Sequence, residues 1–227
     1  MGIREEHEKH KTFWNERTAK RSEATPQFRY QYDFYRRYME ELEEPILDIG
    51  CGDGELLEFL IKDGRRDVYG VDISQIAIGL ARVRLRRHLG DDAIKRLLVG
   101  DMICLSSFFK EGSFNTVFCE GTFHQTTYSG ERMTAEEISK VVSENGLVYL
   151  SVRSDSTPPR NADKVEGEIE TYRLWDEGGI VRCYFSEAGI VELFRDKFRI
   201  LELEERELLT RIDRKSYKMR IIEMKKK

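Results

Sequence analysis

The chain has 227 residues, of which 35% are charged, and a formal net charge of −4 at pH 7. This length suits one α/β domain with additions. No apolar run approaches the length of a membrane span. The first residues lack the apolar core of a signal peptide, so we expect a cytoplasmic protein with no membrane partner. The four cysteines form no C-x-x-C motif, which predicts reduced thiols that pack in the interior and no metal site.

Residues 3–23 are polar and helical in pattern, and residues 27–43 predict a second helix with an aromatic-rich face. His7 and His10 lie three positions apart in the first helix. This spacing allows a pair of metal ligands, but exposed helix histidines are the favoured interpretation.

The most informative segment is a short apolar strand, residues 46–49, followed by a glycine-rich turn and a helix from residue 55. The segment reads Asp48-Ile49-Gly50-Cys51-Gly52-Asp53-Gly54. Glycine at every second position lets the backbone turn sharply and bring a ligand against main-chain N–H groups. The pattern differs from the G-x-G-x-x-G of dinucleotide sites, and Asp48 would repel a pyrophosphate but suit an ammonium or sulfonium. A nucleotide-type ligand at the carboxyl edge of a parallel sheet is indicated, with a purely structural turn as the alternative.

Three further predicted strands also end in an acidic residue. They span residues 66–72, 96–102 and 114–121, and their acids are Asp72, Asp101 and Glu120. Asp72 follows Asp48 by 24 positions, about the length of one β-turn-α-β unit, and stands where a carboxylate would hold a ribose diol. Four carboxylates on one rim would raise each other's pKa values, so their gathering indicates a ligand site rather than a structural feature.

On these motifs the chain resembles the class I S-adenosylmethionine-dependent methyltransferases. The resemblance rests on residues 48–54, Val71-Asp72-Ile73-Ser74, Gly100-Asp101-Met102 and residues 114–121. It implies a three-layer, Rossmann-like α/β fold. Its seven-stranded sheet would have the order 3-2-1-4-5-7-6, with strand seven antiparallel. The implied cofactor is S-adenosyl-L-methionine.

The resemblance also implies a role for each motif residue. Asp48 and Gly50 would hold the methionine ammonium, and Asp72 would take both ribose hydroxyls. Asp101 would accept the adenine amino group, and Glu120 would lie near the sulfonium and the acceptor. The candidate cofactor-binding residues are Asp48, Gly50, Cys51, Gly52, Gly54, Asp72, Ile73, Asp101, Met102 and Glu120. N-terminal helices commonly cover the cofactor site in this family, which adds Trp14, Arg29 and Tyr30 as candidates.

The remaining elements complete such a sheet within a single domain over residues 1–227. Helices are predicted over residues 75–89, 134–144 and 186–196, and strands over 147–152, 198–205 and 216–223. Thr134 and Glu137 read as a capping box for the second of these helices. The predicted division is residues 1–44 as N-terminal helices, 45–153 as the cofactor-binding core, 154–185 as an inserted substrate lid and 186–227 as the final helix and strands. Residues 168–174 and 180–185 predict a hairpin in the insert.

Methyl transfer from a sulfonium is an in-line displacement, which needs proximity, and a base only when the acceptor must lose a proton. His124 and Glu120 are the titratable side chains predicted beside the reacting end, and they are the candidate catalytic residues. A packed, hydrogen-bonded histidine is the alternative for His124. The Asp/Asn-Pro-Pro-aromatic and Pro-Cys motifs of nucleobase and glutamine methyltransferases are missing, which favours an O, N or S atom of a small-molecule acceptor.

Two other hypotheses stay open. Arg82 and Arg86 share a face of the helix 75–89, so an RNA or protein methyltransferase is the first alternative. The net charge of −4 disfavours a nucleic-acid partner. The second alternative is a non-catalytic cofactor-binding partner or a nicotinamide-binding oxidoreductase, against which the intact motifs and Asp48 argue. The acceptor and the oligomeric state are left open.

Overall fold

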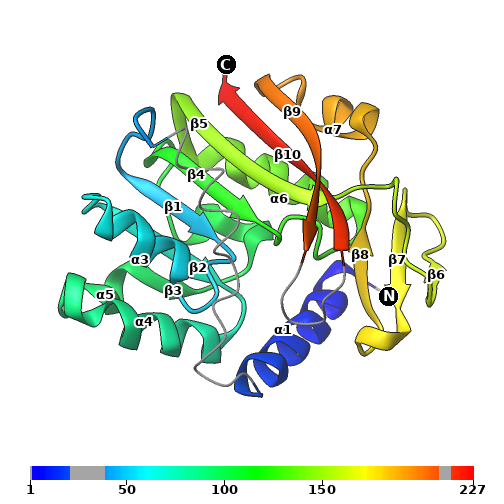
Figure 1. Ribbon diagram of the computed structural model, residues 1–227, viewed down its shortest axis with the longest axis horizontal. Helices are drawn as coiled ribbons and strands as arrows, with labels where there is room; N and C mark the ends of the chain where they lie inside the picture. Colours follow the sequence, from blue (N-terminus) through cyan, green and yellow to red (C-terminus); the bar gives the residue numbers. More distant parts are fainter. Residues whose placement is uncertain (1, 21–38, 210–215) are drawn as a thin grey trace.

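The computed structural model describes residues 2–20, 39–209 and 216–227. Its main sheet comprises β1 (Ile46–Ile49), β2 (Val68–Asp72), β3 (Leu97–Val99), β4 (Phe114–Glu120), β5 (Val142–Arg153), β9 (Phe198–Leu209) and β10 (Ser216–Lys226). The strand order is β3-β2-β1-β4-β5-β10-β9 (Figure 1). All neighbours are parallel except β10, which pairs antiparallel with both β5 and β9. The predicted order and the antiparallel seventh strand are confirmed.

Two apolar cores cover the two faces of this sheet. On one face Ile46 and Phe118 pack with α3 (Glu55–Lys62), α4 (Gln75–Leu89) and the short α5 (Asp92–Arg96). On the other face Leu47 and Val117 pack with α6 (Tyr128–Val141) and α7 (Glu187–Phe194). Successive residues of β1 and β4 therefore point to opposite cores, as expected for parallel strands that are buried on both faces. The three-layer architecture is confirmed.

The start of α6 differs from the prediction. The helix begins at Tyr128, and the Thr127 hydroxyl caps it by accepting a hydrogen bond from the Gly130 N–H at 3.2 Å. Thr134, the predicted cap, lies inside the helix and donates to the Gly130 carbonyl at 3.0 Å. Glu137 accepts the Ser106 N–H at 2.7 Å instead of closing a capping box. The capping-box prediction was wrong because the helix already begins at Tyr128, which places Thr134 and Glu137 inside it.

The insert between β5 and α7 forms a small antiparallel sheet of β6 (Ala162–Lys164), β7 (Thr171–Leu174) and β8 (Ile180–Cys183). The predicted hairpin corresponds to β7 and β8, and β6 was not predicted.

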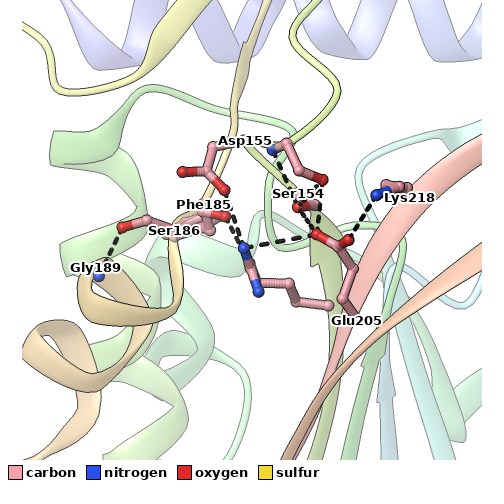
Figure 2. Close-up of polar contacts among 9 residues, drawn as sticks. Ser154, Asp155, Phe185, Ser186, Gly189, Glu205 and Lys218 are labelled. Carbon is pink, nitrogen blue, oxygen red and sulfur yellow. Dashed lines mark hydrogen bonds and ion pairs between the residues drawn. The ribbon is translucent and has the colours of Figure 1, made fainter.

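A polar network ties both ends of this insert to the final hairpin, as Figure 2 shows. Arg220 of β10 donates to the Phe185 carbonyl at 2.9 Å and to the Asp155 carboxylate at 3.0 Å. Glu205 of β9 accepts from Ser154, from Ser156 at 2.7 Å and from Lys218 at 3.0 Å. These contacts lower the pKa of Glu205 to about 2. Both ends of the insert are therefore anchored to β9 and β10 of the main sheet.

The N-terminal helix α1 (Ile3–Ala19) lies between α4 and β8 (Figure 1). Asn15 accepts hydrogen bonds from the Ser74 hydroxyl at 2.8 Å and from the Ile76 N–H at 3.3 Å. At the other end Glu6 pairs with Arg173 of β7, with nitrogen–oxygen distances of 2.6 and 3.2 Å. The helix predicted over residues 27–43, with Arg29 and Tyr30, lies mostly outside the described residues. Within the described ranges, no helix is both long and apolar enough to cross a membrane.

Glu131 of α6 generates a stability prediction. Its side chain is fully buried, and the weakly donating Cys183 thiol is the one partner indicated for its carboxyl among the described residues. Burial, reinforced by the charge of Glu168, raises the pKa of Glu131 well above its usual value. The folded state thus retains a proton that the unfolded chain releases once the pH exceeds the unfolded pKa, and this costs stability as the pH rises.

We expect Glu131→Gln to remove this cost. The difference in unfolding free energy between variant and wild type should grow by up to about 1.4 kcal/mol per pH unit from about pH 5 upward, above the pKa of an unfolded glutamate. Urea unfolding across this range measures it, with Glu136→Gln on the exposed side of the same helix as the control. Parallel pH profiles for Glu131→Gln and wild type would contradict the assignment.

Candidate active site

A cavity of about 880 Å³, counted out to its open mouth, lies at the carboxyl ends of β1, β2 and β4. One wall comes from α1, with His7, His10, Trp14 and Thr18. The opposite wall includes Gly50, Gly52, Asp72, Ile73, Ser74, Asp101, Met102, Glu120, Gly121, Thr122 and Gln125.

The structure brings most of the predicted cofactor residues to this cavity. Those that line it are Gly50, Gly52, Asp72, Ile73, Asp101, Met102 and Glu120. Asp48, Cys51 and Gly54 belong to the same turn but do not line the cavity. Trp14 also lines it, from the helix that was expected to cover the site.

The Asp72 carboxylate is held in place by two backbone donors. The Gly52 N–H donates to one oxygen at 2.9 Å, and the Ser74 N–H donates to the other at 2.8 Å. These contacts tie the glycine turn after β1 to the end of β2. The carboxylate is therefore oriented by the backbone before any ligand arrives.

Two glycines of the turn are required for different reasons. Gly50 has φ +75°, and a Cβ there would overlap with the Thr122 side chain. Gly52 has φ +54°, but a Cβ there would meet no atom within 4 Å. Because Gly52 lines the cavity, that open space is ligand space. Packing thus requires the first glycine, and backbone conformation and ligand access require the second.

The electrostatics of the cavity favour a positive ligand. Asp72, Asp101 and Glu120 line it, and no Lys or Arg does within the described part of the chain. Behind them Asp48 is buried, and its pKa is raised well above the usual value, first by burial and then by the charges of Glu120 and Asp72. A cationic group in the cavity would offset this repulsion.

The two histidines of α1 are buried, so the prediction of exposed histidines was wrong. His7 and His10 are 5% and 2% exposed. His7 Nδ1 lies 2.6 Å from Asp101 Oδ2, and His7 Nε2 lies 2.7 Å from the Thr126 hydroxyl. No cluster of three metal-ligating side chains occurs in the described ranges.

A sequence signal for this burial exists. Positions 7, 10, 14 and 18 carry uncharged residues at helical spacing in an otherwise highly charged segment. Such a stripe indicates the packed face of a helix.

His124 lies behind the cavity wall. It is 2% exposed, it does not line the cavity, and its Nε2 lies 3.3 Å from the side-chain nitrogen of Gln125, which does. Burial and the nearby Arg182 and Arg153 lower the pKa of His124 well below its usual value. Its catalytic role stays a prediction.

No residue of the insert lines the cavity in the described structure, but the insert contacts Gln125, which does line it. Arg182 of β8 forms a bidentate pair with Glu177 at 2.8 and 2.9 Å and donates to Gln125 at 3.3 Å. Whether the insert serves as a substrate lid stays a prediction.

In the described structure, the arginines of helix α4 do not form one cationic surface, because most of them contact other parts of the protein. Arg82 donates to the Leu97 carbonyl at 2.7 and 3.2 Å. Arg84 pairs with Asp53 at 2.6 Å and Glu58 at 3.3 Å. Arg86 is exposed and lies 3.7 Å from Asp91. Most of this cluster holds the fold together.

Comparison with known proteins agrees with the site. Residues 46–146 match a family model described as "Methyltransferase domain". The chain is 30% identical over 119 residues to a protein of Geobacillus sp. (strain WCH70) that is named as a methyltransferase. It is 29% identical over 129 residues to the mouse eEF1A lysine and N-terminal methyltransferase. Each match covers 52% of this chain, but only 46% of the Geobacillus protein and 17% of the mouse protein.

A solved structure extends the likeness of fold to the whole chain. The 1,6-didemethyltoxoflavin-N1-methyltransferase of Burkholderia thailandensis, solved with S-adenosylhomocysteine, has a TM-score of 0.70 at 16% identity. The match covers 100% of this chain and 91% of that one. With the sheet order, the glycine turn and the acid-lined cavity, these findings show that residues 46–146 match a methyltransferase family and that the chain has the fold of solved S-adenosyl-L-methionine-dependent methyltransferases.

Proposed function

We propose that this chain transfers the methyl group of S-adenosyl-L-methionine to an O, N or S atom of a small molecule. The observation that carries the proposal is the cavity at the carboxyl ends of β1, β2 and β4. It combines an oriented Asp72 carboxylate, an open glycine turn and a lining with acids but no Lys or Arg in the described ranges. A cationic nucleoside of modest size fits these features.

The lining residues offer a contact for each part of the cofactor. Asp72 would accept both ribose hydroxyls, while Asp101 and the Met102 N–H would meet the adenine edge. Ile73 would pack on the adenine face. The space beside Gly50 and Gly52 would receive the methionine portion, and an ammonium there would stabilise the ionised form of Asp48. When bound, S-adenosyl-L-methionine supplies an electrophilic methyl carbon on a sulfonium.

The enclosure of the cavity supports a small acceptor. One wall is α1, which is fixed to the core through Asn15 and His7, so the space beside Glu120 and Gln125 is bounded on both sides. A protein acceptor, as in the name of the mouse relative, is the main alternative. The commitment of Arg82 and Arg84 to intramolecular contacts disfavours RNA. We keep Glu120 as the carboxylate proposed to face the sulfonium and the acceptor.

Asp72→Ala should weaken the binding of S-adenosylhomocysteine by roughly 30-fold, because the ribose hydroxyls lose their acceptor, at a cost on the order of 2 kcal/mol. Isothermal calorimetry measures this, with the exposed Asp63→Ala as the control. Since Asp72 also holds two backbone N–H groups, Asp72→Asn and thermal unfolding should be measured in parallel. Equal affinity in wild type and a folded Asp72 variant would contradict the ribose assignment.

The acceptor is tested by incubating the chain with methyl-labelled S-adenosyl-L-methionine and four mixtures of small phenols, amines, thiols and carboxylates. Total RNA and a protein extract are run beside them. We expect label in a small-molecule product, because the cavity is bounded by α1. Label found in protein or RNA instead would support the corresponding alternative acceptor and contradict a small-molecule acceptor. Tight S-adenosylhomocysteine binding with no label in any sample would favour a non-catalytic cofactor-binding protein.

A further inference from the structure

His10 is a buried polar side chain for which the Val181 carbonyl is the one hydrogen-bond partner indicated among the described residues, so at least one of its ring nitrogens has no partner there. It is 2% exposed and lines the cavity together with Glu120, Thr122 and Gln125. Burying an unpaired polar group costs about 1–3 kcal/mol. A ligand that forms a hydrogen bond with His10 would remove this cost, so the side chain is suited to contact a ligand in the cavity.

The surroundings of His10 keep its imidazole neutral. Burial, with the nearby His7 and Arg182 acting in the same direction, lowers the pKa of His10 to about 3. The Val181 carbonyl and Asp101 favour the protonated ring but do not outweigh burial. A neutral imidazole has one N–H donor and one nitrogen that accepts. His10 can therefore accept a hydrogen bond from a ligand.

Several other titratable groups near the cavity already have hydrogen-bond partners within the protein. Both nitrogens of His7 have partners, Asp101 and Thr126. Asp72 accepts two backbone N–H groups, and Asp101 accepts His7 and the Ile103 N–H. His124 does not line the cavity. Within the described residues, His10 is the lining imidazole with an accepting nitrogen that no protein group uses.

We propose that His10 receives the methyl acceptor, by accepting a hydrogen bond from an O–H or N–H of the nucleophile and taking its proton on transfer. This inference rests on the proposed function and narrows the substrate class to neutral hydroxyl or aromatic amine donors. A carboxylate acceptor has no such proton to give, and it would meet the charges of Asp72, Asp101 and Glu120.

The proposed step balances. A lone pair of the acceptor oxygen or nitrogen forms the new bond to the methyl carbon as the carbon–sulfur bond breaks, and the sulfur keeps that electron pair as a neutral thioether. A methylated alcohol or phenol oxygen becomes strongly acidic, and the methylated nitrogen of an aromatic amine moderately so, and even a weakly basic imidazole can take such a proton. The methylated nitrogen of an alkyl amine stays weakly acidic, so alkyl amines are outside the proposed class. His10 then carries the positive charge that the sulfonium has lost, beside the same carboxylates, and releases the proton to solvent.

Imidazole NMR tests the contact without a known acceptor. The chain has four histidines, so ring-labelled histidine gives signals that His7→Gln, His10→Gln, His88→Gln and His124→Gln assign one by one. In the S-adenosylhomocysteine complex we expect a neutral His10 with one non-protonated nitrogen at pH 7. Phenol and aniline, which are both neutral at pH 7, should shift the His10 signal at concentrations where benzoate does not, with His88 as the internal control. A His10 signal unmoved by both donors, or a protonated ring, would overturn the proposal.

Turnover tests the proton transfer. With the acceptor found in the labelling screen, His10→Gln should lower kcat by roughly 100-fold or more. Its affinity for S-adenosylhomocysteine should stay within about twofold of wild type. Wild-type turnover in His10→Gln, or a loss of turnover in His124→Gln alone, would overturn the proposal. If the wild-type chain fails to bind S-adenosylhomocysteine, the proposed function fails instead, and calorimetry separates the two outcomes.

Discussion

The constraint on which this structure depends is the convergence of acidic strand ends at one edge of a parallel sheet. β1, β2 and β4 end at or near Asp48, Asp72 and Glu120, and Asp101 follows β3. Each carboxyl is accommodated differently. Asp48 is buried with a raised pKa, Asp72 accepts two backbone N–H groups, and Asp101 accepts His7. Such an edge is costly without a positive charge beside it, and a sulfonium nucleoside supplies one.

The helix α1 turns this edge into an enclosed site. Three polar contacts fix it: Asn15 to Ser74 of the core, His7 to Asp101 at the cavity, and Glu6 to Arg173 of the insert. The insert is in turn anchored through Asp155 and Phe185 to Arg220. The insert therefore contacts the helix that lines the cavity, although no insert residue lines the cavity in the described ranges. On the role proposed for His10, the acceptor would meet the N-terminal helix rather than residues 154–185.

The motifs that were predicted correctly are those in which a local segment sets its own geometry. The turn 50–54 needs positive φ values, and an acid at the end of a buried parallel strand can only face the carboxyl edge. The cap of α7 is local in the same way, because the Ser186 hydroxyl accepts the Gly189 N–H at 3.0 Å. Sheet order followed from the resemblance, and the pairing of β10 with β5 and β9 confirms it.

The features that were missed depend on contacts distant in sequence. His7 meets Asp101 94 positions away, so the local sequence, although it marks a packed helix face, does not reveal the partner of this histidine. Glu137 accepts the Ser106 N–H instead of capping the first turn of a helix. It does so because the 3-10 helix Met102–Ser107 packs against α6. His124 looked suitable after β4, but the chain turns so that Gln125 faces the cavity. The wall opposite the strand ends comes from α1, and that packing is tertiary.

A crystal structure of the chain with S-adenosylhomocysteine tests the account most directly. We predict that the ribose hydroxyls lie on the Asp72 carboxylate, that α1 remains in place with His7 on Asp101, and that the sulfur faces the space between Glu120 and His10. A ligand bound with its ribose away from Asp72, or a complex in which α1 has left the cavity and His10 faces solvent, would contradict it.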